Sequence, residues 1–182
     1  MSKPNQNFSS IYHDYKQLVY NVALHYLQNT EDAEEVMQDV FVKVYQSLDA
    51  FKNESTLKTW IYRITINQSL DFIKKKKSKK HFFIFGRKSD SEYEVNNIST
   101  FEHPGIQLEN KEEAKTLFDV INTLPDNQKT AFILSKVDGL SNTEISEIME
   151  MSISAIESLL FRAKKSLQEK LSNKFEAYRK KK

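Results

Sequence analysis

Glycine and proline, the residues that most often form turns, are rare in this sequence: three of each occur in 182 residues. A sheet of many strands needs such residues between its strands, so their scarcity favours a mostly helical chain. Cysteine is absent, which excludes disulfides, thiolate catalysis and cysteine-based zinc sites. We therefore predict an all-α protein, and the lack of cysteine also suits a reducing compartment.

Three segments in the first part of the chain have apolar residues at helical spacing, over residues 11–27, 31–48 and 57–77. A cap at Asn29 or Thr30 separates the first two segments. The predicted core stripes are Ile11, Tyr15, Leu18, Val22 and Tyr26 in the first segment and Ala33, Val36, Val40, Val44 and Leu48 in the second. Together the three segments predict a small helical domain over residues 8–80.

The second part of the chain, residues 104–175, predicts four more helices. Leu124 and Pro125 separate the first two, and Gly139 ends the second. Ser141 and Glu144 have the spacing of a capping box at the start of the third. The fourth begins at Ser152 or Ser154, and its predicted core stripe is Ile153, Ile156, Leu160, Ala163 and Leu167. The short turn between the last two helices indicates a helix-turn-helix, with an ordinary helical hairpin as the alternative.

Residues 81–103 lose this periodicity and are predicted to be a flexible linker between the two domains. The linker contains an apolar cluster at residues 82–85, which we expect to dock either on this protein or on a partner. Residues 176–182 form a basic tail.

The net charge is only +2, but residues 74–88 carry eight basic side chains and no acidic one. Such a run favours a polyanionic partner such as nucleic acid, and the alternative is the solvated end of a helix. The last helix presents outward residues that could reach base edges in a major groove. They are Ser154, Glu157, Ser158, Phe161, Arg162 and Lys165. Arg and Lys can bind guanine edges or phosphates, and Glu157 can accept from cytosine.

Four patterns in order resemble one family. They are the acidic helix at 32–41, the helix running into lysines at 59–77, the Leu124-Pro125 pair, and the helix pair at 139–167. Taken together, over about residues 10–172, they resemble bacterial RNA polymerase sigma factors of the extracytoplasmic-function (ECF) type. The resemblance implies a transcription initiation factor that joins core RNA polymerase, recognises the minus-10 and minus-35 promoter elements, and aids strand melting without covalent chemistry.

The resemblance also implies partners and contact residues. The polymerase would be bound through the clamp helices of its largest subunit and the flap of its second largest, and an anti-sigma factor is a further candidate partner. The residues that match the clamp-binding pattern are Asp32, Glu35, Gln38 and Asp39. Complementary charge would steer that docking, and the alternative is a solvated acidic face.

The loop at 51–56 and the helix after it match the part that reads and melts the minus-10 element. Strand opening requires a base to leave the stack and enter a pocket. The matching residues are Phe51, Asn53, Ser55, Lys58, Arg63, Asn67, Lys74 and Lys75. Trp60 and Ile61 are predicted to be core residues instead. The outward residues of the last helix match the minus-35 reader.

Three positions depart from the family pattern. Glu150 stands in the turn where relatives usually have Gly, and Glu157 and Leu159 stand where relatives often have a basic pair. A left-handed backbone at Glu150 would cost about 1 kcal/mol or more.

The main rival prediction is a stand-alone helix-turn-helix regulator, which would bind a palindromic site as a dimer. A nucleic-acid enzyme is disfavoured because the four histidines have no metal or acid-base spacing and no phosphate-binding loop is present. A helical adaptor would leave the lysine run unexplained. We expect no cofactor and no metal. Neither a signal peptide nor a membrane-spanning apolar run is found, so we also expect no membrane insertion and a cytoplasmic protein.

Overall fold

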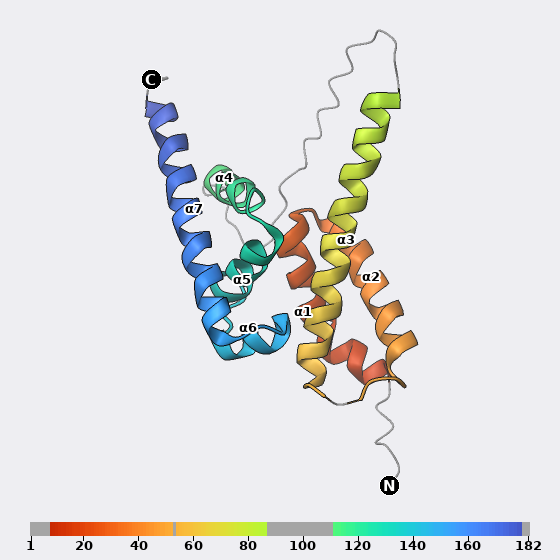
Figure 1. The fold of residues 1–182 in the computed structure, drawn as a ribbon. Helices are drawn as coiled ribbons and strands as arrows, with labels where there is room; N and C mark the ends of the chain where they lie inside the picture. The colour runs from red at the N-terminus through yellow and green to blue at the C-terminus, as the bar shows by residue number, and fades with distance from the viewer. Residues whose placement is uncertain (1–7, 53, 87–110, 180–182) are drawn as a thin grey trace. The chain divides into compact units, whose positions relative to one another are not determined.

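The structure, a computed structural model, describes residues 8–52, 54–86 and 111–179, with side chains described for 8–52, 54–78 and 112–172. The chain divides near residue 103 into two compact units. The described residues form seven helices and no strand, so the all-α prediction is confirmed (Figure 1).

The first unit is a three-helix bundle of α1 (Phe8–Leu27), α2 (Thr30–Ser47) and α3 (Leu57–Gly86). Each helix contacts the other two. The predicted stripes of α1 and α2 supply the core, since Ile11, Val22 and Val40 are buried. Ile61 of α3 is buried as predicted, whereas Trp60 is only partly buried.

Two small polar residues lie in the buried face of α3. Thr65 donates its hydroxyl to the carbonyl of Ile61, and Ser69 donates to the carbonyl of Thr65, both at 2.8 Å. Both side chains are 0% exposed. Because these internal bonds satisfy the hydroxyls, the residues can be buried without a large desolvation cost.

The connection between α1 and α2 is tight. Gln28 has a left-handed backbone, with φ of 51°, and its N–H bonds the carbonyl of Leu24. Asn29 then caps α2, because its side chain accepts from the N–H of Asp32 at 2.8 Å. Of the two caps predicted, Asn29 is therefore the one used.

Helix α3 begins after Thr56, whose hydroxyl accepts from the N–H of Thr59 at 3.1 Å. It continues through Gly86, past the predicted end near Lys80 and into the segment predicted as a linker, and it projects beyond α1 and α2 (Figure 1). Polar composition suggested a linker, but no Gly or Pro interrupts the helix before Gly86, and lysine is a good helix former. The side chains of residues 82–85 lie outside the described residues, so the docking prediction stays open.

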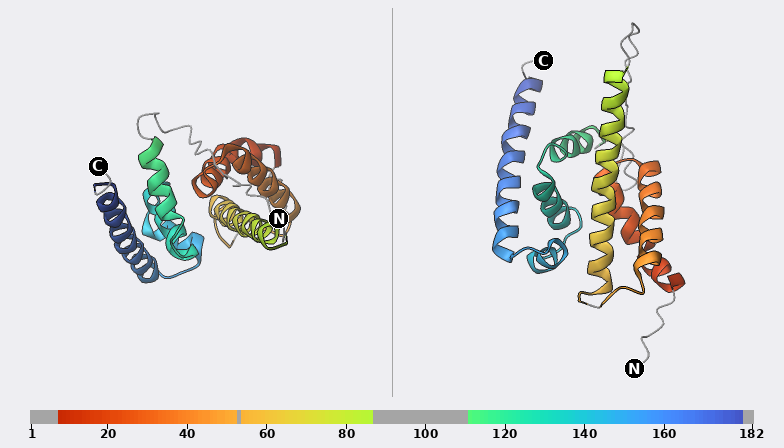
Figure 2. Two further views of the ribbon diagram at one scale, coloured as in Figure 1. Left: turned by 90° about the horizontal axis from the view of Figure 1, so that it is seen from above. Right: turned by 45° about the vertical axis from the view of Figure 1, so that its right-hand side comes forward.

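The second unit contains α4 (Lys111–Ile121), α5 (Asp126–Lys136), α6 (Asn142–Met149) and α7 (Ile153–Arg179). Helix α7 contacts each of the other three, which lie along one side of it, and α5 also contacts α6 (Figure 2). The buried residues of this unit include Phe118, Ile121, Ile133, Leu134, Ile145, Ile156, Ala163 and Leu167.

The helix ends of this unit follow the predicted signals closely. Pro125 immediately precedes Asp126, the first residue of α5, and Gly139 takes a left-handed backbone with φ of 71° after α5 ends. Ser141 and Glu144 form both bonds of the capping box. Helix α7 is capped by Ser152, whose hydroxyl accepts from the N–H of Ala155 at 3.3 Å, so the alternative start at Ser154 is wrong.

Candidate functional site

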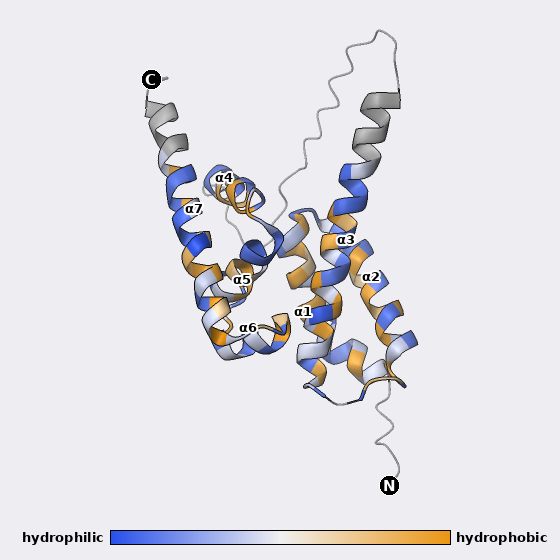
Figure 3. Cartoon of the chain, in the orientation of Figure 1, coloured by the Kyte–Doolittle hydropathy of each residue, from blue (hydrophilic) through white to orange (hydrophobic). Residues whose placement is uncertain are grey.

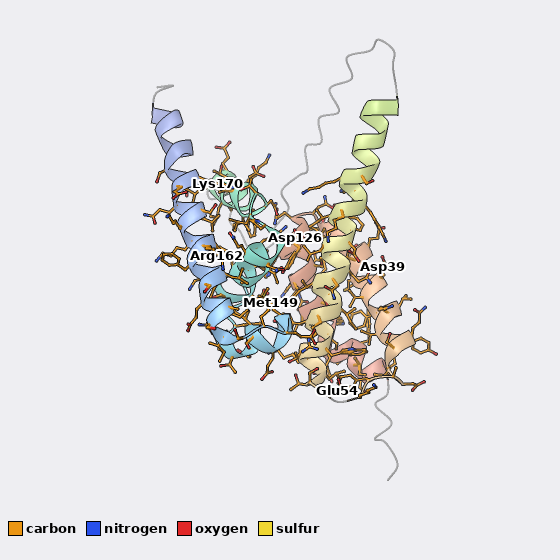
Figure 4. All side chains as sticks on the ribbon, viewed as in Figure 1. Asp39, Glu54, Asp126, Met149, Arg162 and Lys170 are labelled. Atoms are coloured by element: carbon orange, nitrogen blue, oxygen red, sulfur yellow. The ribbon has the colours of Figure 1, made fainter. Side chains whose placement is uncertain are left out.

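The outward face of α2 is acidic. Glu35, Gln38 and Asp39 are exposed because they lie opposite the buried stripe that contains Val36 and Val40 (Figure 4 labels Asp39). Acidic side chains near the start of a helix are also favoured by the positive end of its dipole. This face therefore combines free negative charge with a rigid, capped helix.

Asp32 differs from the other three residues of the predicted set. Its carboxylate pairs with Lys76 of α3 at 2.5 Å, and its side chain is 19% exposed. The pair links the N-terminal turn of α2 to the lysine run of α3. Asp32 therefore holds two helices of the first unit together.

Two apolar residues on the outward side of α2 were not predicted from the sequence. Val42 is 55% exposed and Tyr45 is 67% exposed. Val42 lies three residues after Asp39 and three before Tyr45, so the three share a helix face. The Tyr45 ring packs edge-on against Phe8, with 5.2 Å between centroids. The sequence did contain a sign of this exposure, because both residues are apolar and lie outside the predicted core stripe.

The 51–56 loop is fixed to the start of α3. Phe51 packs its ring against Trp60, with centroids 4.9 Å apart. Ser55 donates to the carbonyl of Thr56, whose hydroxyl meets that of Thr59 at 2.9 Å. Asn53 lies outside the described residues. Phe51 and Trp60 thus anchor the loop on the helix.

Helix α3 does not bring all the predicted minus-10 residues to one face. Arg63, Asn67 and Lys74 are separated by four and seven residues, about one and two turns, so they share a side. Lys58 precedes Asn67 by nine residues, about two and a half turns, and lies on the opposite side. There its ammonium sits 6.0 Å from the centre of the Tyr62 ring. The sequence prediction grouped Lys58 with the residues of the other side as one set.

The lysine run itself is exposed from Lys74 to Lys77. Figure 3 shows these turns of α3 in the blue of hydrophilic residues. Lys76 is turned toward α2 by its pairing with Asp32, while Lys75 is exposed on another side of the helix.

The outward face of α7 matches the prediction in exposure. All six predicted residues are exposed, namely Ser154, Glu157, Ser158, Phe161, Arg162 and Lys165. Phe161 is 70% exposed, an unusual position for a phenylalanine. Figure 4 labels Arg162 on this helix. Helix α7 follows the capped helix α6 after a short turn, and its outward polar side chains are exposed. This arrangement is typical of the DNA-reading helix of a helix-turn-helix.

Two residues of α7 depart from the predicted core stripe. Ile153 is 44% exposed, whereas Leu159 is 8% exposed and packs in the core. Ile153 is the first residue of α7, and the buried residues described in this helix begin at Ile156. Leu159 therefore does not belong to the outward face of α7.

The turn between α6 and α7 is left-handed at Glu150, with φ of 55°. Its N–H bonds the carbonyl of Ser146, and the hydroxyl of Ser146 donates to the carbonyl of Met151 at 2.6 Å. The turn thus keeps the geometry that a glycine would adopt without strain, at a cost of about 1 kcal/mol.

Lys170, farther along α7, is engaged within the second unit. Its ammonium donates to the hydroxyl of Thr123 at 2.6 Å. This bond ties α7 to the residues that follow α4. Lys170 therefore contributes to packing the unit as well as to the charge of the helix.

Within the described ranges, no group of three or more His, Cys, Asp or Glu side chains is placed to hold a metal ion. In the same part of the chain, no helix has both the length and the apolar character needed to cross a bilayer.

These features define a two-unit helical protein with a helix-turn-helix in its second unit. Two family models match it: Sigma-70 region 2 over residues 11–79, and Sigma-70, region 4 over residues 115–167. The chain belongs to the sigma-70 family and is an RNA polymerase sigma factor of the ECF type. It is a transcription initiation factor that directs polymerase to promoters.

Several curated relatives are similar over most of their length. The ECF RNA polymerase sigma factor SigW of Bacillus subtilis is 28% identical over 168 residues, 90% of this chain and 88% of the relative. The ECF RNA polymerase sigma-E factor of Haemophilus influenzae is 29% identical over 141 residues, 77% of this chain and 75% of the relative.

Two solved structures share the fold. CnrH, in complex with the cytosolic domain of CnrY, has a TM-score of 0.63 at 19% identity, covering 93% of this chain and 91% of CnrH. The sigma factor RpoE of Bartonella quintana, in complex with the anti-sigma factor NepR, has a TM-score of 0.61 at 21% identity, covering 92% of this chain and 98% of RpoE.

Proposed function

We propose that the two units divide the work of promoter recognition. The first unit, residues 8–80, binds core polymerase and reads and opens the minus-10 element; the second, residues 104–175, reads the minus-35 element. Residues 81–103 link them, although α3 extends into this stretch, and residues 176–182 form a basic tail. The observation that carries the proposal is that an outward acidic face on α2 and an outward helix-turn-helix face on α7 occur in one chain of this family.

The polymerase-binding surface is the outward side of α2. Glu35, Gln38 and Asp39 supply charge that steers docking on basic clamp helices. Val42 and Tyr45 continue this side as an apolar end, and large, exposed apolar side chains are the usual source of binding energy at an interface. Asp32 acts differently, because it positions α2 against α3 through Lys76.

The minus-10 surface is the 51–56 loop with one side of α3. The loop, including Asn53 and Ser55, forms the pocket for an extruded base, and Phe51 shapes it through its contact with Trp60. Arg63, Asn67 and Lys74 then hold the displaced strand or adjacent duplex. Lys75 adds a phosphate contact at the edge of this side, whereas Lys58 contacts DNA from the opposite side of α3. The energy needed is a few kcal/mol for each base that leaves the stack.

The minus-35 surface is the outward side of α7. The N-terminal turns of such a helix approach base edges, and its later basic residues follow the phosphates. Ser154, Glu157 and Ser158 belong to the first group. Arg162 and Lys165 belong to the second, with Phe161 between the two.

On this proposal the chain performs no covalent chemistry and works in the cytoplasm with the polymerase. The second unit also contacts the flap of the second-largest polymerase subunit. An anti-sigma factor is proposed as a further partner, because the solved structure of the similar RpoE contains one.

Reconstitution tests the proposal. The protein is mixed with bacterial core polymerase and a library of genomic promoters, and new transcripts are sequenced. We expect specific start sites, and we expect Glu35→Arg combined with Asp39→Arg to remove core binding while circular dichroism stays unchanged.

A matched control makes the same charge change elsewhere. Glu112 and Glu113 are exposed at the start of α4, and replacing both with Arg should leave core binding intact. Absence of any complex with core polymerase would overturn the proposal. Tight, dimeric binding of the isolated protein to a palindromic operator would instead favour the stand-alone regulator.

A further inference from the structure

The outward side of α7 carries one acidic residue on its first two turns, where a DNA-reading helix usually carries neutral or basic ones. We propose that Glu157 recognises a cytosine in the minus-35 element, and that this contact sets a base preference specific to this sigma factor. The inference rests on the proposed function of α7 and names the base that one of its residues reads.

The position of Glu157 suits base contact. It is the fifth residue of α7, close to the end of the helix that follows the turn. Its neighbours on the buried side, Ile156 and Leu159, are 0% and 8% exposed, so the glutamate must point away from the core. In helix-turn-helix complexes the N-terminal residues of the second helix contact base edges, while later residues reach the backbone.

On these early turns, the hydrogen-bonding capacity of the Glu157 side chain is also uncommitted. Ser158 donates its hydroxyl to the carbonyl of Ser154 at 2.9 Å, and Arg162 donates its Nε to the carbonyl of Ser158 at 3.2 Å. The hydroxyl of Ser154 meets that of Ser152 at 3.2 Å. Glu157 makes no hydrogen bond or ion pair with the residues that the structure describes, so its two oxygens can accept from a partner.

The chemistry of the carboxylate then selects the base. An ionised carboxylate only accepts hydrogen bonds. In the major groove guanine presents two acceptors, and thymine presents an acceptor and a methyl group. Neither base offers a donor to the carboxylate, and their acceptors repel it. Adenine presents its N6 donor beside the N7 acceptor. Cytosine presents the N4 donor alone and is the best match.

The negative charge also makes the contact selective. A carboxylate facing DNA is repelled by the phosphates, so it adds nothing to sequence-independent binding. It is favourable only where a base donor compensates. A position with glutamate should therefore discriminate between bases more than it contributes to affinity.

The test uses the holoenzyme assembled from full-length protein and core polymerase. A promoter library with a randomised minus-35 element is transcribed, and the products are sequenced. Wild type should prefer cytosine at one position by about 5-fold or more. Glu157→Gln should shift that position toward adenine, which a glutamine amide can bind bidentately, and Glu157→Arg should shift it toward guanine.

Glu169→Gln is the matched control, since Glu169 is exposed three turns farther along α7 and the same charge is removed. It should keep the wild-type preference. Equal melting temperatures for all variants exclude misfolding, because Gln and Arg are helix formers comparable to Glu.

Two results overturn the inference. If the Glu157 variants prefer the same bases as wild type, the glutamate reads nothing while the proposed function survives. If wild type with core polymerase yields no specific transcript from any library member, the proposed function fails and the inference fails with it.

Discussion

Helices α2 and α7 are built alike and present opposite surfaces. Each buries an aliphatic stripe, around Val36 and Val40 in α2 and around Ile156 and Ala163 in α7. Among the described side chains, each leaves one aromatic residue on its outward side, Tyr45 in α2 and Phe161 in α7. The two outward sides differ in charge: the charged side chains are acidic in α2 and mostly basic toward the end of α7. Under the proposed function, the same amphipathic arrangement serves a protein partner in one unit and DNA in the other.

The comparison also shows how each helix is started. Helix α2 follows a left-handed Gln28 and an Asn29 cap, and α7 follows a left-handed Glu150 and a Ser152 cap. Neither turn uses glycine. Both turns are instead held by bonds to the preceding helix, so the orientation of each outward face depends on its own unit.

The largest effect should separate the two units. Ile156→Ala removes a fully buried side chain from the second unit and should lower its free energy of unfolding by about 2–5 kcal/mol. Core polymerase binding through α2 should be kept, because the first unit has its own core. Thermal unfolding and a pull-down with core polymerase measure the two effects. Loss of both together would show that the units are not independent.

The two exposed aromatic residues give the next contrast. Tyr45→Ala should weaken core polymerase binding by about 2 kcal/mol, roughly 30-fold, as for an interface hot spot. Phe161→Ala should leave that affinity unchanged and reduce transcription from minus-35-dependent promoters. Fluorescence anisotropy with labelled protein gives the affinity, and salt should alter the Tyr45→Ala difference little. An unchanged affinity for Tyr45→Ala would remove the apolar end from the proposed surface.

A smaller effect should distinguish Asp32 from its acidic neighbours. Asp32→Asn removes the ion pair with Lys76 and should lower the stability of the first unit by about 0.2–1 kcal/mol, the range for partly exposed pairs. Polymerase affinity should change much less than it does for Asp39→Asn. Urea unfolding combined with the binding assay tests both expectations. A larger affinity loss for Asp32→Asn would place Asp32 in the interface.

The smallest effect should come from the turn before α7. Glu150→Gly relieves the left-handed strain but increases the freedom of the unfolded chain, so we expect a net stabilisation of about 0.5 kcal/mol. Gln28→Gly should not stabilise, because Gln28 is buried and its amide donates to the carbonyl of His25 at 2.8 Å. Urea unfolding of both variants compares the turns. Destabilisation by Glu150→Gly would mean that its side chain supports the turn.

Local signals in the sequence predicted much of this structure. The capping box at Ser141 and Glu144, the cap at Asn29 and the left-handed Gly139 depend on neighbouring residues, so they could be recognised without the fold. The acidic side of α2 followed from its apolar stripe. The exposure of the six predicted residues of α7 followed in the same way.

Other features could not be predicted because they depend on residues distant in the sequence. The pairing of Asp32 with Lys76 joins positions 44 residues apart, and the bond from Lys170 to Thr123 joins positions 47 apart. The end of α3 was misplaced for a local reason instead. A polar composition fits both a linker and a solvated helix, and the absence of Gly and Pro before Gly86 was the sequence signal that favoured the helix.

By itself, the sequence determined the helical class, the order of the helices, and which polar residues face outward, because these depend on spacing and on near neighbours. Only the tertiary structure decided that Leu159 is buried while Ile153, Val42 and Tyr45 are exposed. Burial of an apolar residue depends on whether another helix covers it, and that is a property of packing between helices. For this reason the charge of the last helix and the outward position of Glu157 could be predicted from the sequence, but the burial of Leu159 could not.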